Sequence, residues 1–279
     1  MIQIVSDSAS LYSKTEALKK NLYINPLQVT INKVTYQEFE ELSTEELIDI
    51  INKGHMPKSS QPTLGEIVNT YESFDKDDEV IVLCIADGLS GTYGTAVMGT
   101  LQVDNPDRFI VINSRTLCGP QRYLVDMALA LRDEGKSVKE IVFEINSRLD
   151  HSISFLVPLD FGYLKRGGRL GPLAANLGGF LKLKPVLLQT EDGKRLENFT
   201  LTRTFTLAVK RISKKLKEFG VNEDYIIYIA HDFKSDVVNT YHKLIEQYFP
   251  NVEIQEVKLS PAFVTQGGPG CVAIQAVLK

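Results

Sequence analysis

The chain has 279 residues, of which 43% are hydrophobic and 24% charged, a balance typical of a globular protein with one or two packed domains. Its net charge of −4 and its isoelectric point near 5.7 disfavour a nucleic-acid-binding protein, which usually carries a basic surface. No stretch approaches the ~18 apolar residues that a membrane-spanning helix needs, so we expect no stable membrane insertion.

The cysteines and histidines form no metal-binding or redox motif by their spacing. Cys84, Cys118 and Cys271 are far apart in the sequence, which indicates reduced, mostly buried thiols and a cytoplasmic protein. The first residues, 1–5, have the pattern of an apolar strand and lack the basic start of a signal peptide. We therefore expect a cytoplasmic protein that holds no metal ion and no cofactor.

In the first half of the chain, apolar runs alternate with helical patterns. The runs that predict strands are 2–5, 27–31, 80–86 and 109–113. The segments that predict helices are 44–51, 120–132, a helix opened by Pro62-Thr63, a helix from about Gly91, and a helix capped by Ser137. Repeated strand–helix units of this size predict a parallel sheet covered by helices on both faces.

The second half of the chain has a mixed pattern. Strands are predicted at 152–157, 225–230, 252–257 and 272–278, and helices at 204–219 and 235–248. Segment 181–189 is followed by an Asp-Gly turn at 192–193, which predicts a β-hairpin. We place a domain boundary near residue 150, between an N-terminal Rossmann-like α/β domain (1–150) and a C-terminal α/β domain (151–279).

Two short polar segments at strand-to-helix junctions carry most of the functional information. They are Ser59-Ser60-Gln61-Pro62-Thr63 and Gly88-Leu89-Ser90-Gly91-Thr92-Tyr93-Gly94. Hydroxyls and unpaired N–H groups at helix starts bind anions, although helix capping alone would also explain the first segment. Neither segment contains a Lys, Arg, His or acid, and neither matches a nucleotide-binding motif. Together they predict a neutral site for a carboxylate or phosphate, and binding in preference to acid–base catalysis.

Two further glycine-rich segments have a structural and a functional interpretation each. Segment 265–270, Thr-Gln-Gly-Gly-Pro-Gly, is either a plain turn or a place where the backbone approaches a ligand closely. Segment 163–171 contains Lys165, Arg166 and Arg169, and is either a solvated basic loop or an electropositive patch for an anionic partner.

In this order and at these separations, the four segments resemble the DegV family, whose members include the fatty-acid-binding subunits of bacterial fatty acid kinase. The resemblance spans the whole chain and also includes Val5-Ser6-Asp7-Ser8 and the segment LKLKPVL at 181–187. It implies a two-domain α/β fold of the EDD type, shared with dihydroxyacetone kinase. The N-terminal domain would have a parallel sheet, the C-terminal domain would be mixed α/β, and a ligand tunnel would lie between them.

The resemblance also implies a lipid-binding carrier and not an enzyme. One long-chain fatty acid, such as palmitate or oleate, would be held for a separate ATP-dependent kinase subunit, which phosphorylates it to an acyl phosphate for phospholipid synthesis. The implied contacts of the carboxylate are Ser59, Ser60, Ser90, Gly91 and Gln266. The implied partner or phosphotransfer patch is Arg166, Arg169 and Arg203.

Two positions depart from the family pattern. Ser59 stands where the family often has Thr, which keeps the hydroxyl, and Gln266 stands where members commonly have His. Gln donates a hydrogen bond but carries no charge, so a regulatory or small-molecule-processing protein of the same fold with a different ligand stays open as an alternative. Side chains that could line the tail tunnel, or belong to the plain core, are Phe155, Phe161, Leu164, Phe180, Leu187 and Phe263.

Overall fold

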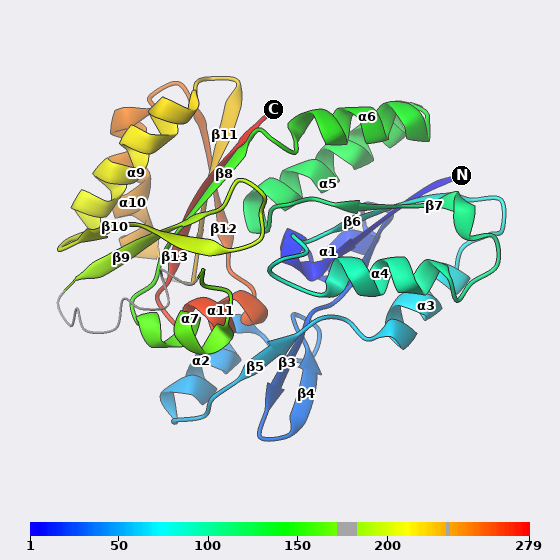
Figure 1. The fold of residues 1–279 in the computed structure, drawn as a ribbon, viewed down its shortest axis with the longest axis horizontal. Helices are drawn as coiled ribbons and strands as arrows, with labels where there is room; N and C mark the ends of the chain where they lie inside the picture. The colour runs from blue at the N-terminus through cyan, green and yellow to red at the C-terminus, as the bar shows by residue number, and fades with distance from the viewer. Residues whose placement is uncertain (172–182, 233–234) are drawn as a thin grey trace.

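The computed structural model describes residues 1–171, 183–232 and 235–279 (Figure 1). Its first sheet is parallel, with strand order β2-β1-β6-β7. The strands are β1 (Ile2–Asp7), β2 (Leu22–Asn25), β6 (Glu79–Cys84) and β7 (Phe109–Asn113). Val80 to Cys84 are all buried, as the continuous apolar run in this strand predicts for a sheet covered on both faces.

Helices cover both faces of this parallel sheet, with α5 and α6 on one side and α3 and α4 on the other (Figure 1). Thr63, Ser137, Ser43 and Ser13 each cap a helix through a reciprocal bond with a glutamate three residues on, which stabilises these helix starts. The helical elements of this half are η1 (Ser8–Ser10), α1 (Lys14–Leu18), α2 (Thr44–Asn52), α3 (Leu64–Glu72), α4 (Thr92–Thr100), η2 (Pro106–Arg108), α5 (Cys118–Asp133) and α6 (Val138–Arg148).

The second sheet is mixed, with order β10-β9-β8-β13-β11-β12 and one parallel pair, β11 with β12. Helices α9 (Phe205–Phe219) and α10 (Ser235–Tyr248) cover its outer face (Figure 1). Its strands are β8 (Ser152–Val157), β9 (Lys184–Gln189), β10 (Leu196–Thr202), β11 (Tyr225–His231), β12 (Glu253–Lys258) and β13 (Val272–Leu278). The predicted hairpin is confirmed as β9 and β10.

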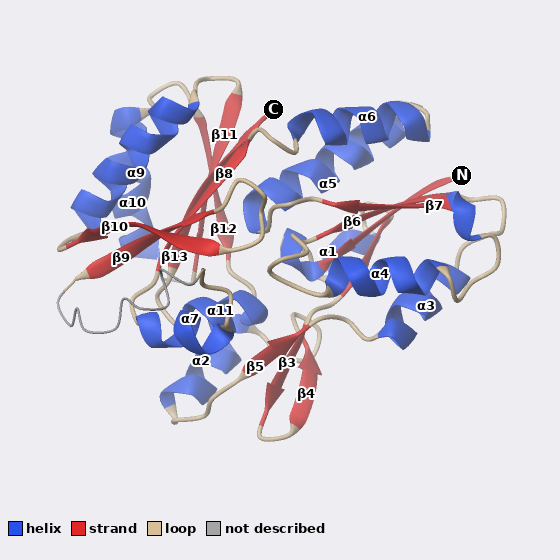
Figure 2. Ribbon diagram, viewed as in Figure 1, coloured by secondary structure: helices blue, strands red, loops and turns tan. Residues whose placement is uncertain are grey.

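A third, antiparallel sheet of order β4-β3-β5 lies below the other two, near α2, α7 (Phe161–Gly167) and α11 (Pro261–Gly267) (Figure 2). Its strands are β3 (Gln28–Ile31), β4 (Val34–Gln37) and β5 (Lys58–Ser60). The sequence pattern placed a strand at 27–31 correctly but missed β2, β4 and β5. These strands are three or four residues long, so they show little periodicity of their own.

The α/β class is confirmed, with a parallel sheet followed by a mixed one. Every strand of the parallel sheet precedes residue 150 and every strand of the six-stranded sheet follows it. One cluster of buried side chains contains residues from both halves, among them Leu47, Ile85, Leu259 and Ala273. Along the described part of the chain, no helix combines the length and the apolar character needed to cross a membrane.

A fully buried carboxyl joins the two halves beside this cluster. The Ser8 hydroxyl donates to Oε1 of Glu38 at 2.5 Å, and the main-chain N–H of Ala262, in the first turn of α11, donates to Oε2 at 2.8 Å. Burial raises the pKa of Glu38 to about 7, and burial likewise raises the pKa of Asp7 to about 6. Glu38 thus positions α11 through the hydrogen bond that it accepts from the Ala262 N–H.

The raised pKa of Glu38 predicts a stability that decreases as the pH rises. Between about pH 4.5 and pH 7 the folded protein keeps a proton that the unfolded chain has released, so the free energy of unfolding falls across this window. Glu38→Gln, isosteric with the protonated acid, should remove up to about 3 kcal/mol of that fall. Urea unfolding at the two ends of the window measures it. The matched control, Glu72→Gln on the exposed side of α3, should keep the parental slope, and an unaltered slope in Glu38→Gln would contradict the assignment.

Candidate functional site

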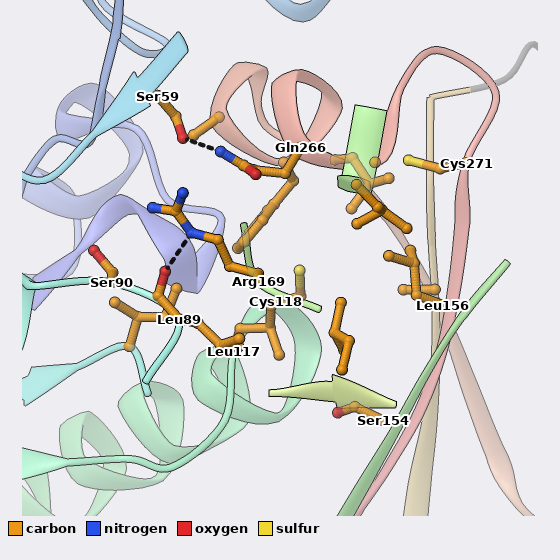
Figure 3. Close-up of a pocket in the computed structure, with 18 of the residues that line it drawn as sticks. Ser59, Leu89, Ser90, Leu117, Cys118, Ser154, Leu156, Arg169, Gln266 and Cys271 are labelled. Carbon is orange, nitrogen blue, oxygen red and sulfur yellow. Dashed lines mark hydrogen bonds between the residues drawn. The ribbon is translucent and has the colours of Figure 1, made fainter. Parts of the chain in front are cut away.

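A pocket lies where the loop after β6, the start of α5, α7, α11 and the strands β8 and β13 meet (Figure 3). Its empty space, the open mouth included, is about 890 Å³. Because the lining comes from both halves of the chain, the pocket depends on how the two large sheets are packed against each other.

The polar lining residues gather mainly at one end of the pocket (Figure 3). Ser59, Ser90, Arg169 and Gln266 lie at this end, and Ser60 follows Ser59 in the chain, whereas the polar residues Ser154 and Gln275 lie apart from them. Most of the remaining lining is Leu, Ile, Phe and Ala, and among the described lining residues Arg169 is the one with a charge. The pocket therefore combines a polar, cationic mouth with an apolar interior, which is an arrangement suited to an amphiphilic anion.

Gln266 and Ser59 meet at this mouth although they are 207 residues apart. The Gln266 carboxamide donates from Nε2 to Ser59 Oγ at 2.7 Å, while its Oε1 is buried and has no protein partner among the described residues. Since Ser59 accepts this bond, its own hydroxyl hydrogen stays available to a ligand. Gly167 lies against the Gln266 carboxamide so closely that a Cβ atom there would overlap Oε1, which explains a glycine at this position.

Ser90 stands at the start of α4. Its Oγ lies 2.8 Å from Thr92 Oγ1, and the Gly91 N-cap makes no side-chain capping bond. The Thr92 N–H donates to Ser90 Oγ at 3.4 Å, and the other N–H groups at a helix start are left for water or an anion. Ser90 can thus act together with the positive end of α4.

Arg169 follows α7, and its guanidinium points into the mouth between Ser59 and Ser90 (Figure 3). Nε donates to the Leu89 carbonyl oxygen at 3.1 Å, and NH1 donates to the Gly167 carbonyl oxygen. Desolvation by burial lowers the pKa of Arg169, but an arginine stays charged at neutral pH. Among the described residues no carboxylate pairs with it, so its charge is neutralised only if an anion binds.

Two of the three cysteines, Cys118 and Cys271, line the apolar part of the pocket. All three are buried free thiols, as the sequence predicts. Burial raises the pKa of both lining thiols well above the ordinary range. They therefore serve as small apolar lining groups and not as nucleophiles.

The structure brings some of the residues singled out in the sequence together and leaves others apart. Gly91 does not line the pocket and packs against Gln61. Arg166 is exposed, with its guanidinium 4.6 Å from the centre of the Tyr163 ring, and Arg203 is exposed just before α9. Of the candidate tail contacts, Phe155, Leu164 and Phe263 line the pocket, Phe161 and Leu187 do not, and Phe180 lies outside the described residues.

Sequence reasoning missed two polar residues of the pocket, Ser154 on β8 and Gln275 on β13. Gln275 is the polar exception in the apolar strand VAIQAVL, and Ser154 interrupts the apolar residues of SISFLV, so these irregularities were the available signal. For segment 265–270 the sequence left a plain turn and a close backbone approach to a ligand as alternatives, and the helix α11, which ends with Thr265, Gln266 and Gly267, was not predicted.

The loop that carries Ser90 is held by the β9–β10 hairpin. Gln189 Nε2 donates to the carbonyl oxygens of Arg115 at 3.2 Å and Gly193 at 3.0 Å. Gly193 adopts a left-handed backbone with φ of 75°, and the main chain of Lys194 lies directly against Gly88. A Cβ atom at Gly88 would overlap that main chain, so the turn of the hairpin and the Ser90 loop can pack only with a glycine here.

Comparisons with known proteins agree with this architecture. The family model described as "Uncharacterised protein, DegV family" matches residues 1–279. A DegV domain-containing protein of Staphylococcus aureus, SA1258, is 30% identical, and the match covers 99% of this chain and 98% of that protein. The protein therefore belongs to the DegV family.

Two solved structures share the fold over 99–100% of both chains. A DegV family protein from Thermus thermophilus, described for its fatty acid binding, superposes with a TM-score of 0.89 at 25% identity, covering 100% of this chain and 99% of that one. DegV from Bacillus subtilis, described as a fatty acid binding protein, superposes with a TM-score of 0.86 at 27% identity and the same coverage.

The packing of Gly88 predicts an asymmetric result for two glycine substitutions in one segment. Gly88→Ala should lower the free energy of unfolding by about 1–3 kcal/mol, because the added methyl group forces the hairpin away. Gly94→Ala, where a Cβ atom meets nothing within 4 Å, should be neutral or stabilising by up to ~1 kcal/mol within α4. Urea unfolding of both variants provides the test, and equal stabilities would refute the interlocked packing.

Proposed function

We propose that this protein binds one long-chain fatty acid, with the carboxylate at the mouth formed by Ser59, Ser90, Gln266 and Arg169 and the tail in the apolar interior. The observation that carries the proposal is the single guanidinium, without a carboxylate partner in the described chain, at the polar end of an otherwise largely apolar pocket. An ionised carboxylate is costly to bury unless donors replace its hydration, and the serine hydroxyls and Arg169 supply such donors.

The apolar interior supports a ligand with a long hydrocarbon tail. Each buried methylene contributes about 0.8 kcal/mol, so a tail rather than a head group would supply most of the affinity. The two structural relatives described as binding fatty acids add support, since both superpose over the full length of this chain. A small phosphorylated ligand would leave this apolar surface uncovered, which weighs against the small-molecule-processing alternative.

We further propose that the protein is a carrier that presents its ligand to a separate ATP-dependent kinase subunit. Ser60 is exposed and Ser59 and Ser90 are partly exposed, so the head-group end is open to a partner while the interior is closed. Arg169 could stabilise the added phosphate of an acyl phosphate, because a guanidinium binds two oxygens at once. Arg166 and Arg203 on the surface are the proposed contacts for the partner.

The proposed binding predicts one bound lipid per protein, which Ser90 helps to hold. Native mass spectrometry of the protein expressed in bacteria should find one bound fatty acid, and titration of the delipidated protein should show palmitate or oleate binding. Ser90→Ala should weaken this binding by about 1–3 kcal/mol, the usual cost of leaving a buried polar partner unsatisfied.

The matched control for that variant is Ser213→Ala. Ser213 is buried in α9 and does not line the pocket, so the same change of side chain should leave the affinity unaltered. If the protein carries no lipid and binds neither palmitate nor oleate, the fatty-acid proposal is wrong. Equal affinities of the parent and Ser90→Ala would remove Ser90 from the head-group site.

A second prediction separates presentation from binding. Arg203→Glu should slow phosphorylation of the bound fatty acid by the kinase subunit at least tenfold, which is an increase of about 1.4 kcal/mol in the activation free energy. The affinity for the lipid should not change, because Arg203 is exposed and lies outside the pocket. Arg211→Glu, the same reversal on the exposed face of α9, is the control. Parallel loss of lipid binding and phosphorylation in Arg203→Glu would show that this residue serves the pocket instead.

A further inference from the structure

The wall of the pocket changes from apolar to polar along one face of the six-stranded sheet. In the antiparallel pair β8–β13, Leu156 lies opposite Ala273, and Ser154 lies opposite Gln275 two residues further on. All four line the pocket. Ser154 lies on the side of the pocket away from Ser59, Ser90 and Arg169 (Figure 3). The Ser154–Gln275 pair is therefore a polar floor far from the mouth.

The floor is held by hydrogen bonds that use the whole Gln275 carboxamide. Nε2 donates to Ser154 Oγ at 2.9 Å and to the Leu117 carbonyl oxygen at 3.1 Å, and Oε1 accepts from the Gly119 N–H at 3.2 Å. Gln275 is only 1% exposed and Ser154 5%. The bonds to Ser154 and from Gly119 are buried, so the carboxamide cannot turn aside for a ligand without leaving the Gly119 N–H at the start of α5 unpaired.

Packed side chains lie beside the floor in the described part of the chain. Gln275 is flanked in the sheet by Ser154 on one side and Tyr228 on the other. Gly119 at the start of α5 lies against the Tyr228 side chain so closely that a Cβ atom there would overlap it. The contact of α5 with β11 thus closes the pocket directly behind the polar pair.

We propose that Ser154 and Gln275 end the tail site and set the longest acyl chain that the protein accepts. This inference rests on the proposed binding of a fatty acid. A tail that reached the pair would cover the Ser154 hydroxyl with hydrocarbon, which offers no hydrogen bond in place of water. Tails that stop at Leu156 and Ala273 gain affinity with each methylene, and longer tails gain nothing further.

The test is calorimetric titration of the delipidated protein with saturated fatty acids from lauric to arachidic. Each added methylene should lower Kd by about fourfold, the equivalent of ~0.8 kcal/mol, until the tail reaches the floor, where the series should break. Ser154→Ala, which frees space and removes the hydroxyl, should move the break to a longer acid. Ser154→Val, which adds bulk at the same point, should move it to a shorter one.

Two comparison variants separate the floor from the mouth and from general effects. Ser213→Ala should keep the parental series, and Ser90→Ala should raise Kd for every acid by a similar factor without moving the break. A break that moves in neither Ser154 variant, or in the same direction in both, overturns this inference while the proposed function stands. If no acid binds to the parent protein, the proposed function fails and this inference fails with it.

Discussion

A guanidinium held at the mouth of an apolar pocket is the interaction on which the functional interpretation depends. Arg169 is fixed by the carbonyl oxygens of Leu89 and Gly167, and these bonds orient the cation without neutralising it. Its desolvation has a free-energy cost that a bound anion would offset. The same main-chain contacts join the Ser90 loop to the end of α7, so orienting the charge also assembles the hydroxyls around it.

Close backbone contacts between distant segments give the pocket its shape. The turn of the β9–β10 hairpin packs against Gly88, the Tyr228 side chain packs against Gly119, and the Gln266 carboxamide packs against Gly167. Buried polar bonds reinforce these contacts, with Glu38 bound to the first turn of α11 and Gln275 bound to the start of α5. Each contact leaves little room for a side chain, so the pocket depends on several glycines and a few buried polar groups acting together.

Gln266 places a neutral carboxamide at the mouth of the pocket. A neutral carboxamide donates to Ser59 at any pH, whereas an imidazole changes its charge near neutrality. The charge at the mouth therefore comes from Arg169, and the donors beside it are neutral. The sequence shows a glutamine at position 266, but only the structure shows that its carboxamide donates to Ser59.

Local patterns in the sequence determined the α/β class, the buried parallel strand β6, most helix starts and the β9–β10 hairpin, because periodicity and capping act within a few residues. They also identified the serine and glycine segments as anion-binding candidates. The sequence patterns missed the short strands β2, β4 and β5 and the helix α11. The formation of these elements depends on packing against the rest of the chain. Tertiary structure alone decided that Arg169 faces the pocket while Arg166 and Arg203 do not, and that Ser154 and Gln275 meet beneath α5. The Ser154–Gln275 bond joins residues 121 positions apart, and no local pattern specifies which distant side chains will meet.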